Sequence, residues 1–137
     1  MEAVTDELAI RNRLAAFAQA SDFGDLSEVM DFFTEDARLV VGDRPPIEGR
    51  PAVTEQFRRM RDEGLTGPRN DCLHVVGSPV ATLAGDTART RAYFELLTDT
   101  RAAPRIRSAG IFEDHWRRTS AGWCVEGRVV ILKDPVA

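Results

Sequence analysis

The sequence predicts an α+β protein: a cone-shaped α+β barrel in which N-terminal helices pack into a strongly curved, mainly antiparallel β-sheet. Two observations predict this class. Apolar residues in the first half recur at the spacing of helices, and in residues 72–132 the pattern changes to the two-residue alternation of strands. Helices and a sheet then form two layers, and a strongly twisted sheet can curl around the first helix and leave a cavity.

The first helix is expected from Thr5, a suitable N-cap residue, to about residue 20. Ile10, Leu14 and Phe17 lie at i, i+4 and i+7, which places them on one face. This helix therefore presents an apolar stripe to the rest of the fold.

A second, shorter helix is expected after the glycine at position 24. Asp25 and Glu28 have the spacing of a capping box, with Asp in place of Ser or Thr. Its apolar face consists of Leu26, Val29, Met30 and Phe33. Residues 38–41 are partly β-branched and precede the sequence GDRPP, so we expect a short strand followed by a loop.

A third helix is expected between Gly49 and Gly64. Pro51 suits the first turn of a helix, and the Gly-Pro pair at positions 67 and 68 prevents continuation. The apolar residues that share one face are Val53, Phe57 and Met60.

Four strands are expected in the second half, joined by the turn sequences AGD, DTRAAP and SAG. They are predicted at residues 72–80, 87–98, 105–118 and 122–132. Because the connections are short, we expect an antiparallel meander. In the strand at 87–98, small or apolar residues alternate with a second set, so the two faces should meet different environments; the first set is Ala88, Thr90, Ala92, Phe94 and Leu96.

Length and composition fit one soluble domain covering residues 1–137. Apolar residues make up 43% and charged residues 29% of the chain, and no apolar run approaches the roughly 18 residues of a membrane helix. The acidic start lacks the features of a secretory signal, so we expect a cytoplasmic protein without a membrane partner.

Charge and cysteine content exclude several classes of partner. The net charge is −4, from 22 acidic and 18 basic residues, which argues against nucleic-acid binding. Cys72 and Cys124 have no CxxC motif or nearby His at ligand spacing, so we expect free thiols and no metal site. Since there is also no phosphate loop or dinucleotide fingerprint, no cofactor is expected.

Several short motifs occur in an order that is informative as a set. They are GDL at 24–26, FTEDARL at 33–39, IEGRPAV at 47–53, H-x-x-G at 74–77, GDTA at 85–88, GIFEDHWRR at 110–118 and GWCVEGR at 122–128. Over nearly the whole chain they resemble the nuclear-transport-factor-2-like superfamily, and within it the SnoaL-like group of scytalone dehydratase, polyketide cyclases and bile-acid dehydratase. The resemblance implies a homodimer through the outer sheet face, where we expect Ile111 and Val130.

The resemblance also implies site residues. Scytalone dehydratase-like members have an Asp and a His at the positions of Asp22 and His74, and Arg128 is the nearest match to an Arg of bile-acid dehydratase-like members. The tyrosines of such dehydratases are replaced here by Phe17 or Ser21 and by Val41. A second catalytic His has no counterpart near residue 98, and the Asp base of steroid isomerase relatives also falls at Val41.

Taken alone, the two matched residues allow more than one interpretation. His74 either transfers protons near neutral pH or hydrogen-bonds a backbone carbonyl in a polar core. Asp22 either ends a helix or accepts an imidazole N–H of His74, which would fix the tautomer. A short distance between the two side chains would favour the catalytic interpretation.

Further residues are candidates for substrate contact. Asp114 either lines the pocket or makes a buried hydrogen bond, and Arg128 either pairs with a carboxylate or binds a ligand oxygen. His115 is expected at the surface. The strand pattern leaves the face of Tyr93 undecided. The predicted substrate-binding set is Arg128, Asp114, Phe17, Val41, Tyr93 and Phe112.

Two functions follow as hypotheses. The first is a cofactor-independent dehydratase, isomerase or cyclase that acts on a hydrophobic, oxygenated small molecule with His74 as acid or base and Asp22 as its partner. The second is a non-catalytic ligand-binding or assembly module with a degenerate pocket. An open cavity favours the enzyme, whereas a cavity filled by Phe17, Phe94 and Phe112 favours the module.

Overall fold

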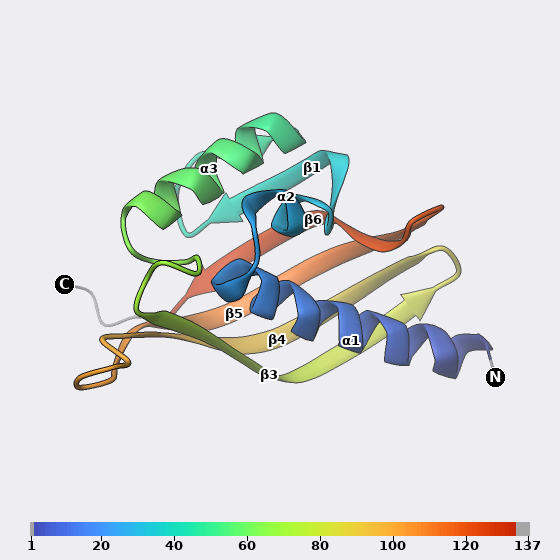
Figure 1. Cartoon of the computed structure of the whole chain (residues 1–137). Helices are drawn as coiled ribbons and strands as arrows, with labels where there is room; N and C mark the ends of the chain where they lie inside the picture. Colours follow the sequence, from blue (N-terminus) through green and yellow to red (C-terminus); the bar gives the residue numbers. More distant parts are fainter. Residues whose placement is uncertain (1, 134–137) are drawn as a thin grey trace.

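A computed structural model describes residues 2–133 of the chain (Figure 1). These residues form three helices and six strands. Their order is α1 (Glu2–Phe23), α2 (Leu26–Met30), β1 (Phe33–Val41), β2 (Ile47–Glu48), α3 (Arg50–Asp62), β3 (Cys72–Ala84), β4 (Thr87–Thr98), β5 (Arg105–Thr119) and β6 (Gly122–Leu132).

The six strands form one mixed, open sheet in the order β2-β1-β6-β5-β4-β3. The β3 to β6 strands form the antiparallel meander that the sequence predicts, and β1 pairs with β6 in parallel. The helices pack on one side of the curved sheet, with α1 against β3 and α3 against β1 (Figure 1). The α+β class and the curved, mainly antiparallel sheet are therefore confirmed.

The element boundaries differ from the sequence prediction in two places that matter for the site. Helix α1 continues to Phe23, so Asp22 lies in its last turn and not after it. Strand β1 begins at Phe33, five residues before the predicted start. The reason is tertiary: Phe33 pairs with Val125 of β6, and the register then shifts before Arg38 resumes the ladder.

Smaller differences also have physical causes. The two-residue strand β2 was not predicted, because it depends only on pairing with Arg38 and Leu39 of β1. Strand β3 continues beyond residue 80 to Ala84 after a register shift between Gly77 and Val80. Near this shift Ser78 has a positive φ of 52°, which bends the edge strand.

An aromatic cluster joins the helices to β1. The Phe17 ring stacks on Phe32 at 5.1 Å between centroids and meets the edge of Phe33 at 5.1 Å, and Phe57 of α3 lies 5.7 Å from Phe33. All four rings are buried. Burying a Phe side chain stabilises a fold by about 1.5–3 kcal/mol, so this cluster fixes α1 and α3 relative to the sheet.

Burial shows which strand residues face the helices and which face outward. The two faces of β4 meet different environments, as predicted, and the set that is buried on the helix side contains Ala88, Ala92, Phe94 and Leu96. Val130 is also buried and faces inward, so its predicted place on the outer face is wrong. The residue before it, Val129, is exposed, because successive side chains of a strand point to opposite faces of the sheet. None of the helices within residues 2–133 is long and apolar enough to cross a membrane.

A glycine in β5 is required by close packing. A Cβ at Gly110 would lie 2.0 Å from the carbonyl oxygen of Ile131 and 3.0 Å from the Phe94 ring. Because a backbone atom cannot yield, we expect Gly110→Ala to lower the free energy of unfolding by about 2 kcal/mol or more. Urea denaturation measures this.

Gly77→Ala is the matched control. A Cβ at Gly77 meets no atom within 4 Å, so the substitution should change stability by less than about 0.5 kcal/mol. Equal stability of the two variants would contradict the close packing of β5 against β6.

Candidate functional site

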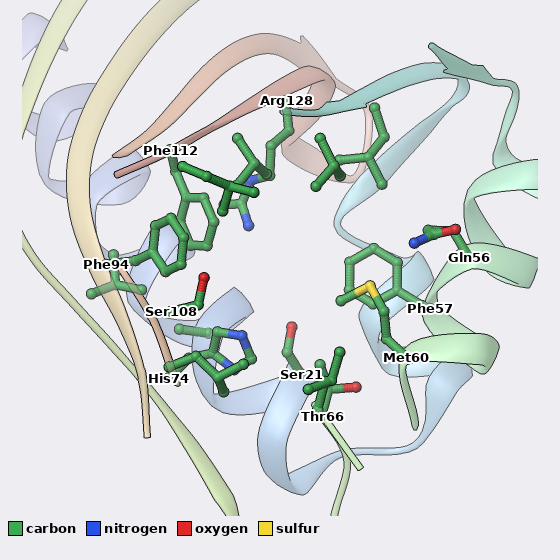
Figure 2. A pocket seen from close by; sticks show the side chains of 18 of the residues that line it. Ser21, Gln56, Phe57, Met60, Thr66, His74, Phe94, Ser108, Phe112 and Arg128 are labelled. Carbon is green, nitrogen blue, oxygen red and sulfur yellow. The ribbon is translucent and has the colours of Figure 1, made fainter. Parts of the chain in front are cut away.

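A cavity of about 760 Å³ lies between α1, α3 and the inner face of the sheet. Figure 2 shows side chains from helices and strands surrounding it. Most of its wall is apolar; examples from seven elements are Leu14, Val41, Phe57, Val76, Phe94, Leu96, Phe112 and Val130. The polar lining residues are Ser21, Arg44, Gln56, Arg59, Glu63, Thr66, His74, Arg107, Ser108 and Arg128. The volume and the mainly apolar wall suit a small organic ligand.

Asp22 and His74 form a two-point contact between α1 and β3. The imidazole Nδ1 of His74 lies 2.8 Å from Oδ1 of Asp22, and the backbone N–H of His74 donates to Oδ2 at 2.6 Å. The Asp22 side chain is 1% exposed and the His74 side chain 12% exposed. The helix end thus supplies a buried carboxylate, and the strand start presents an imidazole to the cavity.

This geometry determines the tautomer of neutral His74. The carboxylate can only accept, so Nδ1 carries the proton and donates it to Asp22. Nε2 then carries the lone pair, and no residue in the range 2–133 makes a hydrogen bond to it. The available nitrogen belongs to a side chain that lines the cavity (Figure 2).

A second buried ion pair lies on the β5 and β6 side of the cavity. Arg128 donates from Nε and Nη2 to the two oxygens of Asp114, at 2.7 and 2.8 Å. The guanidinium is held between two rings, with its carbon 4.4 Å from the Phe17 centroid and 3.9 Å from that of Phe112. Such a bidentate, stacked guanidinium is rigid.

The third nitrogen of this guanidinium, Arg128 Nη1, has no hydrogen-bond partner among residues 2–133. It is not one of the fully buried atoms of that range that lack a partner, so it is accessible. In Figure 2 the end of Arg128 and the ring of His74 both extend toward the same open space. The cavity therefore holds a free imidazole nitrogen and a fixed cationic donor.

The comparison with known families identifies the class of protein. The profile of the SnoaL-like domain matches residues 2–129. The chain belongs to the SnoaL-like domain family. No curated protein sequence matches it significantly.

Solved structures share the fold of this SnoaL-like domain. One is an NTF2-like protein with a cystatin-like fold from Novosphingobium aromaticivorans, with 24% identity, a TM-score of 0.86 and coverage of 99% of this chain and 87% of that one. A second, at 19% identity, is the β subunit of a proposed aromatic-ring-hydroxylating dioxygenase from the same organism, with a TM-score of 0.78 and coverage of 99% and 94%.

A third similar structure contains a ligand. It is a protein from Catenulispora acidiphila in complex with S-DNPA, with 18% identity, a TM-score of 0.78 and coverage of 96% of this chain and 95% of that one. At these identities the likeness shows the fold.

The SnoaL-like domain brings together only part of the site set predicted from its sequence. His74, Arg128, Val41 and Phe112 line the cavity. Asp22 does not line it but contacts it through His74.

Three predicted substrate contacts are corrected. Asp114 is 1% exposed and lies behind Arg128, and Phe17 is 1% exposed beneath the same guanidinium, so both act on the cavity through Arg128. Tyr93 is 65% exposed on the outer face, because it alternates with the inward Phe94. His115 is exposed, as expected.

Some lining residues were missed by sequence reasoning. Ser21, Gln56 and Ser108 come from α1, α3 and β5, and only the closed fold brings them to one cavity. Ser21 offered a weak signal, since it precedes Asp22. Its hydroxyl donates to the Phe17 carbonyl at 3.0 Å, which leaves the oxygen lone pairs available as acceptors.

The buried thiol of Cys72 lies near the Asp22 carboxylate and has low reactivity. Burial, with the negative charges of Asp22 and Asp71, raises the pKa of Cys72 to about 11. It is therefore protonated at neutral pH and is a poor nucleophile. Within the described range, no three His, Cys, Asp or Glu side chains gather closely enough to hold a metal ion.

The role of Asp22 in setting the tautomer can be tested with Asp22→Asn. An amide has one acceptor oxygen, and the backbone N–H of His74 requires it, so the amide NH₂ would face Nδ1. We expect neutral His74 to change from the Nδ1–H to the Nε2–H form. Side-chain ¹⁵N chemical shifts measure this change, with the exposed His115 as an internal control. An unchanged His74 tautomer would contradict the assignment.

Proposed function

We propose that this SnoaL-like domain is an enzyme that removes a proton next to a carbonyl of a hydrophobic, oxygenated small molecule, and so catalyses dehydration, isomerisation or cyclisation. The observation that carries the proposal is the short contact between buried Asp22 and His74 at a mainly apolar cavity. The proposed chemistry uses only side chains of this chain.

His74 would act as the base through Nε2. When Nε2 takes the proton, the imidazolium is stabilised by the Asp22 carboxylate, which lies 2.8 Å from Nδ1. Arg128 Nη1 would donate to the carbonyl oxygen as negative charge develops there. A fixed donor in a mainly apolar site stabilises such charge more than water does, because it needs no reorientation.

The protonated imidazole can complete any of the three reactions. In a dehydration the electrons of the enolate form the double bond, the β-hydroxyl leaves, and His74 gives it the proton, so that water is released. In an isomerisation His74 returns the proton to another carbon of the substrate. In a cyclisation the enolate carbon attacks a second carbonyl, whose oxygen receives the proton.

The openness of the cavity supports an enzyme over a filled core. Phe94 and Phe112 stack on each other at 4.2 Å with 3° between their planes, so the two rings form one block at the side of the cavity. Phe17 lies behind Arg128. Neither Phe94 nor Phe112 fills the space in front of His74 (Figure 2), and Phe17 is not among the residues that line the cavity.

A non-catalytic module is the second candidate. It is favoured by the position of Tyr93, the single tyrosine of the chain, which points outward and supplies no phenol to the cavity. One structural neighbour is described as a β subunit of a dioxygenase, a role in assembly. The activity test below separates the candidates.

The activity test uses a panel of cyclic ketones and β-hydroxy ketones in D₂O. Deuterium incorporation is followed by NMR and water loss by the absorbance of the conjugated product. For a ketone that reacts, we expect His74→Gln to lower the rate about 10²- to 10⁴-fold, since that is the usual contribution of a general base. His115→Gln, the matched control at the exposed histidine, should leave the rate unchanged. Undiminished turnover by the His74→Gln variant would contradict the proposal.

A homodimer through the outer sheet face is also proposed. Tyr93, Ile111 and Ile131 pair across β4, β5 and β6 and form an apolar row on that face. Val75 and Val129, both partly exposed, extend it. An apolar row on an uncovered sheet face is a common site of association.

We expect the protein to sediment as a dimer at micromolar concentration and Tyr93→Glu to sediment as a monomer, because a carboxylate would be desolvated in the row. Analytical ultracentrifugation measures both. Phe23→Glu is the control, since Phe23 is 67% exposed but lies at the end of α1. A monomeric wild-type protein would contradict the dimer.

A further inference from the structure

The residues that line the cavity divide by exposure into a closed interior and an opening. Leu14, Phe57 and Phe94 are at most 5% exposed and form the interior. Six exposed residues mark the opening: Arg44, Arg59, Glu63, Ile106, Arg107 and Leu132. A ligand in the cavity would therefore meet these side chains with the end that remains near solvent.

Three arginines from separate parts of the fold converge on this opening. Arg44 lies between β1 and β2, Arg59 on α3, and Arg107 near the start of β5. Within residues 2–133 none of their side chains makes an ion pair or a hydrogen bond. The carboxylate that lines the same opening is Glu63, so positive charge predominates there.

This arrangement differs from the rest of the surface. The chain has a net charge of −4, and elsewhere its arginines are mostly neutralised. Those paired with a carboxylate are Arg11, Arg38, Arg50, Arg58, Arg91, Arg105, Arg117, Arg118 and Arg128. The unpaired cations at the opening thus form a local positive field on an acidic protein, which attracts anions.

The interior offers no comparable charge. The Arg128 guanidinium is neutralised by Asp114 at 2.7 Å, and the remaining walls are apolar or carry neutral polar groups apart from His74. Two exposed apolar side chains, Ile106 and Leu132, continue the apolar wall to the opening beside Arg107. The cavity is thus apolar within and cationic at its mouth.

We propose that the ligand of this cavity is an amphipathic organic anion. Its apolar ring body lies in the interior, and its carboxylate or phosphate lies at the opening against Arg44, Arg59 and Arg107. The inference rests on the proposed function in taking this cavity as the substrate site, and it adds an anionic group to the expected ketone. Guanidinium groups suit this role because they bind carboxylate and phosphate oxygens through paired N–H groups.

The test compares two fluorescent ligands with the same ring system. One is 8-anilino-1-naphthalenesulfonate, and the other is N-phenyl-1-naphthylamine, which lacks the sulfonate. In fluorescence titrations at low ionic strength the wild-type protein should bind the sulfonate about tenfold more tightly. Replacing each arginine with Gln should weaken binding of the sulfonate about twofold to fivefold. The triple variant should bind the two ligands equally. Binding of the amine should be the same in all variants.

Two controls locate the effect. Arg89→Gln removes another exposed, unpaired arginine that lies outside the cavity, and it should change neither titration. Ala18→Trp places a large ring in the cavity from α1 and should weaken binding of both ligands. Sulfonate binding that survives Ala18→Trp would mean a site elsewhere and would overturn the inference.

Competition identifies the anionic group. Displacement of the sulfonate by 1-naphthaleneacetate or by 1-naphthyl phosphate, but not by neutral 1-naphthaleneacetamide, supports a carboxylate or a phosphate respectively. Equal displacement by the neutral amide overturns the inference.

The outcome is independent of the activity test. His74→Gln should keep the preference for the sulfonate, because His74 lines the interior and is not one of the exposed residues of the opening, and Gln, like neutral His, carries no charge. Equal binding of the two fluorescent ligands by the wild-type protein would reject the anionic substrate even if turnover depends on His74. If the protein prefers the sulfonate but turns over no ketone, the proposed chemistry is rejected and the anionic ligand is retained.

Discussion

The carboxylate of Asp22 holds the end of α1 against the start of β3, because it accepts hydrogen bonds from both the backbone and the imidazole of His74. Hydrogen bonds to a buried charge contribute about 1.5–3 kcal/mol each, and an unpaired carboxylate at this depth would be costly. This contact therefore holds the edge strand β3 against the helix and at the same time sets the proton position on the candidate base. Fold and site depend on the same two residues.

The opposite wall is organised by the same principle. Arg128 is buried, and its charge is tolerated because Asp114 accepts two hydrogen bonds and two phenylalanine rings hold the guanidinium plane. A buried pair of this kind contributes little net stability, but the loss of one partner is expensive. Its value lies in position: it leaves one donor fixed beside an apolar cavity.

Sequence reasoning was most successful where the signal is local. The helical spacing of Ile10, Leu14 and Phe17 reports which side of α1 is buried, and the alternation in β4 reports that its two faces meet different environments; the structure agrees with both. It failed where burial depends on a partner strand. Phe33 was assigned to a helix face, yet it begins β1 because β6 pairs with it in parallel. The face of Tyr93 was left undecided and Val130 was placed on the wrong face, since a shift of one residue exchanges the faces of a strand.

The sequence by itself determined the fold class through local periodicity and pointed to the family through the order of its motifs. The two residues of the proposed acid-base pair followed from the resemblance to that family. Tertiary structure alone decided that Asp22 touches His74, that Asp114 and Phe17 act through Arg128, and that Arg44, Arg59 and Arg107 share one opening. The physical reason is that these contacts join segments far apart in the chain. Their geometry is set by how the sheet curves around α1, which no local pattern encodes.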